Sequence, residues 1–240
     1  MSIVAECIYD LVCANRILGH EGVVDGFGHV SLRHPERPEH FLISRSRSPE
    51  LVTEKDILEV KFNGDPVEAN APPLYNERFI HAAIYEIRSD VQAVIHNHAY
   101  EMIPFGVTGV PLMPIFHSAA RMGMNVPVWD ISDSFGDATS MLVTDIERGR
   151  DLAKGLGQNK LVLMRGHGAT VASHSLYDAV LTSIFAHVNA RLQQHAMAMG
   201  DVRYLKPGEI ETMVAHQEAR KASRDRQWEY YCRRAGCDPR

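Results

Sequence analysis

Apolar side chains recur at helical spacing in several long stretches of the chain, and shorter apolar runs lie between them. The helical pattern predicts helices over residues 3–18, 74–88, 145–156, 175–199 and 207–234. Gly19 and Gly22 are expected to close the first helix, and Pro72 and Pro73 to precede the second. The chain is therefore rich in amphipathic helices that need a common surface to cover.

The short apolar runs predict strands, which would form a sheet for the helices to cover. They cover residues 29–33, 40–44, 57–62, 91–98 and 160–164. An Asn-Gly-Asp sequence at 63–65 predicts a hairpin turn, and the Gly- and Pro-rich segment 104–127 predicts a loop. Helices and strands alternate without an internal repeat. We therefore expect one α/β domain over residues 1–240, its sheet covered on both faces, with 207–240 as a C-terminal helical extension.

Charge and cysteine content narrow the class of protein. The net charge of -5 provides no basic field for a polyanion. Cys7, Cys13, Cys232 and Cys237 match no zinc-finger or secreted disulfide spacing. The chain has no run of about 18 apolar residues, and no basic segment precedes an apolar run at its start. We expect a cytoplasmic protein with reduced thiols that binds neither nucleic acid nor membrane.

Two imidazoles stand two residues apart at the end of an apolar strand, in a Val-Ile-His-Asn-His sequence that ends at His98. Side chains at this spacing in a strand point to the same face. Neutral imidazole is a common nitrogen ligand for zinc, manganese and iron. His96 and His98 therefore form a candidate clamp for a divalent ion. Such pairs also occur at ordinary surfaces and in cores, so the interpretation needs further ligands.

Two more ligand candidates lie elsewhere in the chain. His167 follows a short buried strand and has glycine on both sides, which lets the backbone bend sharply. A plain tight turn is the alternative interpretation. Glu77 lies on the helix that leads into the His-x-His strand, one turn before His81 on the same face. A lone helical glutamate is usually solvated, so its assignment depends on the histidines.

The order Glu77, His81, His96 and His98, followed by an Arg-Gly-His-Gly sequence around His167, resembles the class II aldolase and adducin family. The resemblance implies a central, mainly antiparallel sheet with helices on both faces. It also implies that three histidines bind a divalent ion, and that Glu77 ligates the ion or acts as acid and base. Adducin-type members are structural proteins that lack the metal histidines, so this chain is expected to be an enzyme.

The loops expected to contact a substrate differ from those of sugar-phosphate members of the family. Such members usually carry small polar residues after the first helix, whereas Phe27 and His29 stand there in this chain. These segments resemble a branch of decarboxylases that act on hydroxylated pyridine or benzene dicarboxylates. The same branch includes iron-dependent oxygenases that act on hydroxyphenyl acids.

Non-oxidative decarboxylation of a hydroxylated aromatic dicarboxylate, such as a hydroxypyridine dicarboxylate or a dihydroxyphthalate, is the primary hypothesis. His96, His98 and His167 would hold Zn²⁺ or Mn²⁺, which would chelate the phenolate and carboxylate of the substrate. Glu77 would complete the coordination or deliver a proton, and the second role suits a raised pKa. His29 would orient or protonate the ring.

Four further residues are assigned to substrate binding: Ser44, Arg45, Arg47 and His117. Two guanidinium groups among serines suit planar carboxylates, although an exposed basic loop has the same composition. The resemblance implies a homotetramer with sites at subunit interfaces. The alternatives are an Fe²⁺-dependent oxygenase that uses the same histidines, an aldolase that cleaves a sugar phosphate, and a non-catalytic adducin-like protein.

Overall fold

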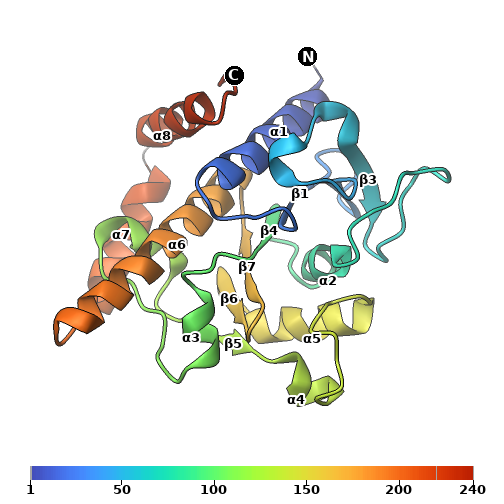
Figure 1. Ribbon diagram of the computed structural model, residues 1–240. Coiled ribbons are helices and arrows are strands. Elements are labelled where there is room, and N and C mark those ends of the chain that lie inside the picture. The colour runs from blue at the N-terminus through green and yellow to red at the C-terminus, as the bar shows by residue number, and fades with distance from the viewer. Residues whose placement is uncertain (1, 220, 240) are drawn as a thin grey trace.

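The centre of the molecule is a seven-stranded sheet in the order β3-β2-β1-β4-β7-β6-β5 (Figure 1). The computed structural model describes residues 2–219 and 221–239. Neighbouring strands are antiparallel except β5 and β6, which run parallel. The strands are β1 (His29–Arg33), β2 (His40–Ser44), β3 (Ile57–Lys61), β4 (Ala93–Asn97), β5 (Val128–Trp129), β6 (Leu161–Met164) and β7 (Gly168–Ser173). The predicted mainly antiparallel sheet is confirmed.

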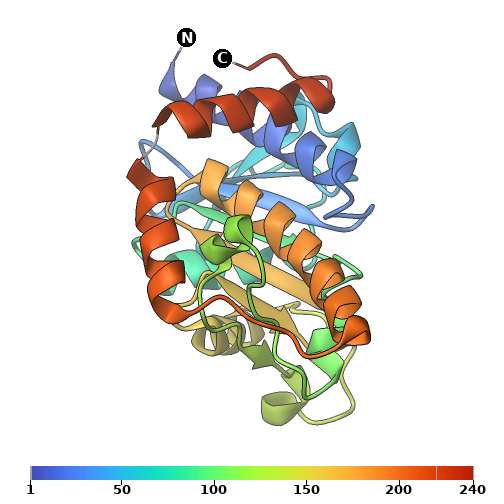
Figure 2. The same ribbon diagram turned by 90° about the vertical axis from the view of Figure 1, so that its left-hand side faces the viewer.

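Helices cover both faces of the sheet (Figures 1 and 2). On one face pack α1 (Ile3–His20) and α6 (Leu176–Met199), and on the other α2 (Arg78–Ile87) and α5 (Ile146–Leu156). The shorter elements are α3 (Ile103–Val107), α4 (Ile131–Phe135), η1 (Pro49–Leu51), η2 (Glu54–Asp56) and η3 (His117–Met122). The α/β class and the two covered faces are as the sequence predicts.

Strand β4 shows how the sequence separates the two layers. Ala93 and Ile95 belong to the apolar cluster under α1 and α6, whereas Val94 belongs to the cluster under α2 and α5. Burial of each large apolar side chain contributes about 1.5–3 kcal/mol, so the alternation fixes which face each residue takes. His96 follows Val94 by two residues and therefore lies on the α2 side of the sheet.

Side-chain caps set the start of the long helices. Ser2, Asp145 and Ser175 each accept a hydrogen bond from a backbone N–H in the first turn of α1, α5 and α6. Such caps satisfy donors that have no partner within the helix. None of the helices in residues 2–219 and 221–239 is both long enough and apolar enough to cross a membrane.

The structure corrects several predicted elements. Helix α2 begins at Arg78, not at residue 74, and the segment 104–127 contains part of α3 and all of η3. The elements β5, β7 and α4 were not predicted. The predicted helix over 207–234 is two helices, α7 (Pro207–Ala219) and α8 (Lys221–Arg234), and residue 220 lies outside the described part.

The two C-terminal helices pack against different parts of the molecule. Helix α7 packs against η3, whereas α8 packs against α1. Figure 2 shows that the two helices run in clearly different directions. One straight helix could not pack against both η3 and α1, so tertiary packing overrides the continuous helical pattern of the sequence.

Candidate metal centre

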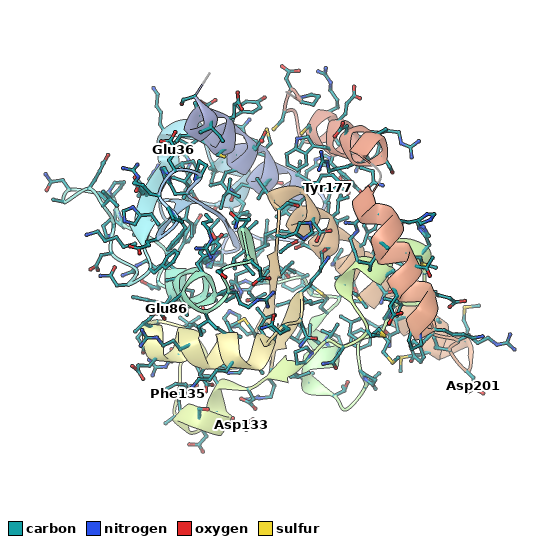
Figure 3. All side chains as sticks on the ribbon, turned by 180° about the vertical axis from the view of Figure 1, so that it is seen from behind. Glu36, Glu86, Asp133, Phe135, Tyr177 and Asp201 are labelled. Atoms are coloured by element: carbon teal, nitrogen blue, oxygen red, sulfur yellow. The ribbon has the colours of Figure 1, made fainter. Side chains whose placement is uncertain are left out.

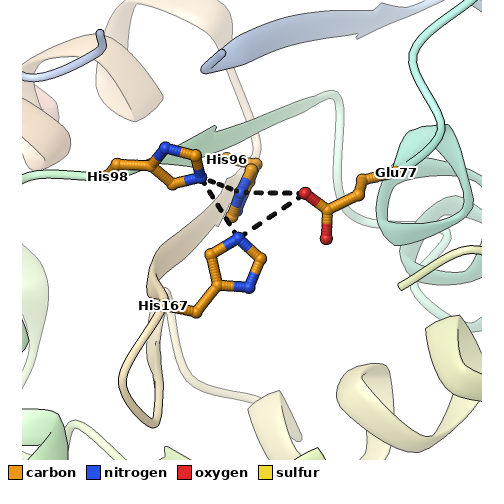
Figure 4. A group of neighbouring side chains, drawn as sticks. All are labelled: Glu77, His96, His98 and His167. Atoms are coloured by element: carbon orange, nitrogen blue, oxygen red, sulfur yellow. Dashed lines mark hydrogen bonds and ion pairs between the residues drawn. The ribbon is translucent and has the colours of Figure 1, made fainter. Parts of the chain in front are cut away.

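Four side chains from three places in the chain converge at the end of β4 (Figure 4). His96 is on the strand and His98 follows it, His167 lies in the turn between β6 and β7, and Glu77 directly precedes α2. The Nε2 atom of His98 lies 3.1 Å from Nε2 of His96 and 3.1 Å from Nε2 of His167. Oε2 of Glu77 lies 3.7 Å from Nε2 of His96 and 3.5 Å from Nε2 of His167. The four candidate ligand atoms lie within 4.8 Å of one another.

The second nitrogen of each ring faces a group that orients the ring. Nδ1 of His98 lies 3.1 Å from Oδ2 of Asp25, and Nδ1 of His167 lies 3.0 Å from the carbonyl oxygen of Met141. Nδ1 of His96 lies 3.5 Å from Oγ1 of Thr170. A carboxylate and a carbonyl only accept, so Nδ1 donates in the first two rings and Nε2 carries the lone pair. This is the arrangement in which metal-ligating histidines are usually held.

The donor set fits a divalent ion. Lone pairs directed at one another across 3.1 Å repel unless a proton or a cation lies between them. Nitrogen ligands at about 2.0–2.1 Å from a tetrahedral metal lie roughly 3.3 Å from each other. Burial also lowers the pKa of His96 to about 3, which keeps this imidazole in the neutral form that ligates.

Glu77 is held as an ionised carboxylate. Burial alone would raise its pKa, but the close approach of His167 and His96 outweighs burial and lowers the pKa to about 2. Its Oε1 accepts a hydrogen bond from the Val143 N–H at 2.9 Å, which leaves Oε2 for the histidines. The lowered pKa and the geometry suit a ligand, and the assignment of Glu77 to proton delivery stays a prediction.

Gly168 allows the two histidine-bearing segments to approach each other. A Cβ atom added there would overlap the carbonyl oxygen of Asn97 and press on His98. Gly168→Ala is therefore expected to lower the free energy of unfolding by about 2 kcal/mol or more, measured by urea denaturation. Gly106→Ala is the matched control, because its added Cβ would meet no atom closer than 3.7 Å. Equal stability of the two variants would contradict the close approach.

A cavity of about 600 Å³ opens beside the four candidate ligands. Its lining includes Glu77, His98 and His167. The other lining residues are mainly apolar or aromatic: Phe27, His29, Ser46, Leu74, Tyr75, Asn76, Ser140, Met141, Leu142 and Gly166. The cavity therefore combines a largely apolar and aromatic lining with a cluster of ligating atoms.

The structure places one of the predicted substrate contacts at this cavity and the others elsewhere. His29 lines it. Ser44 is buried behind it and shares a 2.8 Å hydrogen bond with the Tyr75 hydroxyl. His117 is on η3, in a separate pocket with Arg121 and Phe185. Ser44 and His117 are therefore not among the residues that line the cavity.

The two arginines of the basic loop contact an acid of their own. Nε of Arg45 donates to Oδ1 of Asp56 at 2.6 Å, and Nη1 of Arg47 lies 3.4 Å from the same oxygen. Neither arginine lines the cavity, whereas Ser46 between them does. Their assignment to substrate binding stays a prediction.

The ring-orienting residues of the centre were not found from the sequence. Asp25 lies in the loop before β1, and its Oδ1 accepts from the N–H groups of Phe27 and Gly28. Burial alone would raise the pKa of Asp25, but these bonds and His98 lower it. The signal available was an aspartate beside glycines ahead of a strand, which is common in ordinary turns.

The fold and the site define a class of α/β protein with a three-histidine, one-carboxylate centre at the end of a central strand. The family model described as Class II Aldolase and Adducin N-terminal domain matches residues 9–219. The chain belongs to the class II aldolase and adducin family, which confirms the resemblance seen in the sequence.

Individual relatives agree with this placement. "Decarboxylase tropJ" of Talaromyces stipitatus is 34% identical over 195 residues, which are 76% of this chain and 73% of that protein. A "3,4-dihydroxyphthalate decarboxylase" of Arthrobacter keyseri is 28% identical over 208 residues, 79% of this chain and 78% of that protein. The crystal structure of an aldolase II superfamily protein from Pseudomonas syringae superposes with a TM-score of 0.80 at 22% identity, covering 98% of this chain and 94% of that one.

Proposed function

We propose that the chain is a metal-dependent, non-oxidative decarboxylase of a hydroxylated aromatic dicarboxylate, such as a hydroxypyridine dicarboxylate or a dihydroxyphthalate. The observation that carries the proposal is the cavity, whose lining is largely apolar and aromatic and includes three of the candidate ligands. A planar ring with polar groups along one edge fits such a lining, whereas a sugar phosphate needs hydroxyls and amides around its phosphate. The relatives that are named decarboxylases support the same reaction.

Different residues of the chain would hold the metal ion and orient the substrate. His96, His98, His167 and Glu77 would hold Zn²⁺ or Mn²⁺, which supplies a Lewis acid for the phenolate and the adjacent carboxylate of the substrate. Phe27 and the other apolar wall residues would orient the ring and exclude water from the reacting carbon. The carbon–carbon bond breaks, its electron pair stays on the ring carbon, carbon dioxide leaves, and a proton takes its place.

The same proposal includes a cytoplasmic homotetramer with sites at subunit interfaces. Phe27 and Tyr100 are large aromatic residues with 75% and 69% of their surface exposed in the single chain. Phe27 lines the cavity, and the Tyr100 hydroxyl lies 3.5 Å from the Asp25 that orients His98. A neighbouring subunit would cover both aromatic residues and close that side of the cavity.

Anaerobic turnover tests the reaction. The metal-analysed protein is incubated without oxygen with a panel of ortho-hydroxy aromatic dicarboxylates, and carbon dioxide release is followed. We expect release from at least one of them, which also identifies the ring. Turnover that requires both oxygen and Fe²⁺ would contradict the proposal and favour an oxygenase.

A further inference from the structure

A second buried polar cluster lies directly behind the cavity wall. It consists of His29, Ser31, His81 and Tyr85, and none of these residues is more than 1% exposed. Nδ1 of His29 lies 2.6 Å from Nε2 of His81, and Nδ1 of His81 lies 2.6 Å from Oγ of Ser31. Oγ of Ser31 lies 2.8 Å from the Tyr85 hydroxyl. The four side chains form one continuous hydrogen-bonded chain that ends at the cavity.

The pairing of strands and helix explains why these residues meet. His29 and Ser31 are two apart on β1 and so share a face, and His81 and Tyr85 are four apart on α2 and so share a face. Because α2 packs on that side of the sheet, the two pairs interdigitate. His81 therefore faces His29 and Ser31, although it lies on the same helix that follows Glu77.

Counting donors gives the chain a direction. The Tyr85 hydroxyl has two acceptors in reach, Ser31 at 2.8 Å and the Gln92 carbonyl at 3.4 Å. The Gln92 carbonyl already accepts from the Arg33 N–H at 2.7 Å, and 3.4 Å is long for an O–H···O bond. Because a buried hydroxyl proton needs an acceptor, we assign the Tyr85 proton to the bond with Ser31. The Ser31 hydroxyl is then free to donate to Nδ1 of His81.

The direction continues through the two rings. A neutral imidazole has one N–H and one lone pair. Because Nδ1 of His81 accepts, its Nε2 carries the proton and donates to Nδ1 of His29. Nδ1 of His29 then accepts, so the proton of His29 is on Nε2, the nitrogen left for the cavity that the ring lines.

We propose that Tyr85, Ser31 and His81 are positioning residues that fix His29 as an Nε2–H donor toward a substrate carboxylate in the cavity. This inference rests on the proposed function for the nature of the substrate. The His29 ring centre lies 5.0 Å from that of the candidate ligand His96. A carboxylate beside the candidate ligands is therefore within the range of a donor on His29. The opposite tautomer would present a lone pair there and repel the same carboxylate.

The tautomer can be measured without any substrate. Nitrogen-15 NMR of histidine-labelled, zinc-loaded protein distinguishes the protonated from the unprotonated ring nitrogen, and His29→Asn assigns the His29 signals. We expect His29 to carry its proton on Nε2, and Ser31→Ala to lower that population because His81 loses its donor. A wild-type His29 protonated on Nδ1 would overturn the inference, as would a tautomer that Ser31→Ala leaves unchanged.

Kinetics tests the same point through a double-mutant cycle. Ser31→Ala is expected to lower kcat/KM about tenfold. Without Ser31, His29 would donate less often to the charged carboxylate of the substrate, so that hydrogen bond is lost in part. In a His29→Asn background the same substitution should cause no further loss. Equal losses in both backgrounds would show that Ser31 acts on the fold alone. Ser183→Ala is the matched control, since within the described part of the chain this buried hydroxyl donates to the Ala179 carbonyl in its own helix α6 and to no residue of the site. If no dicarboxylate is turned over, the proposed function fails, whereas the NMR result still decides the tautomer.

Discussion

Glu77→Gln is expected to lower kcat by roughly 100-fold or more while the protein stays folded. Glu77 directs Oε2 at His96 and His167 and holds that direction through the Val143 N–H. The amide has the same shape but no charge, so it keeps the packing and loses the anionic ligand. Loss of a group that merely supports a metal ligand already costs 10–100-fold, so removal of a ligand should cost at least the upper end. Steady-state rates and circular dichroism on the same samples measure the two effects.

Glu86→Gln is the matched control for this substitution. Glu86 is on α2, the helix that Glu77 precedes, and lies toward the edge of the molecule (Figure 3). There it pairs with Arg150. Exposed ion pairs of this kind contribute little to stability, so this variant should retain both its activity and its fold. Full turnover by the Glu77 variant would remove Glu77 from the reaction.

His98→Ala is expected to weaken binding of Zn²⁺ by at least roughly 100-fold. His98 is the central ligand candidate, because its Nε2 lies 3.1 Å from Nε2 of both other histidines. Its ring is partly exposed at the cavity, so the truncation should leave the core intact. Competition with a chromogenic chelator measures the affinity, and urea denaturation without metal measures the stability.

His195→Ala provides the control for the loss of an imidazole, since His195 is exposed on α6. It should bind zinc as the unaltered protein does. Equal affinities for all three proteins would show that the ion, if bound, lies somewhere other than at this centre.

The sequence predicts the parts of the molecule that follow from local periodicity. β1 and β2 agree with their predicted bounds, and α1, α5 and α6 agree within two residues, because apolar spacing and side-chain caps are local signals. β7 was not predicted because its Gly-Ala-Thr-Val-Ala-Ser sequence has few large apolar residues. Its strand pairing with β4 and β6 is a long-range effect that no local window contains.

The same distinction applies to the site. Strand ends and a glycine turn are enough to select His96, His98 and His167 from the sequence. The selection of Glu77 depends on the resemblance of the chain to the class II aldolase and adducin family. The structure brings all four side chains together. Asp25 and Thr170 act only through spatial contact with rings that are distant in sequence. The composition of the loop around Arg45 favours a carboxylate ligand. In the structure, the carboxylate that Arg45 contacts is Asp56 of the same chain.

The most direct test of the account is a titration of metal content against activity. Protein is treated with increasing chelator, the divalent ion that remains bound per chain is measured by mass spectrometry, and anaerobic carbon dioxide release is followed in the same samples. The account predicts that release falls in proportion to the bound ion and returns when Zn²⁺ or Mn²⁺ is restored. Undiminished release from metal-free protein would contradict it.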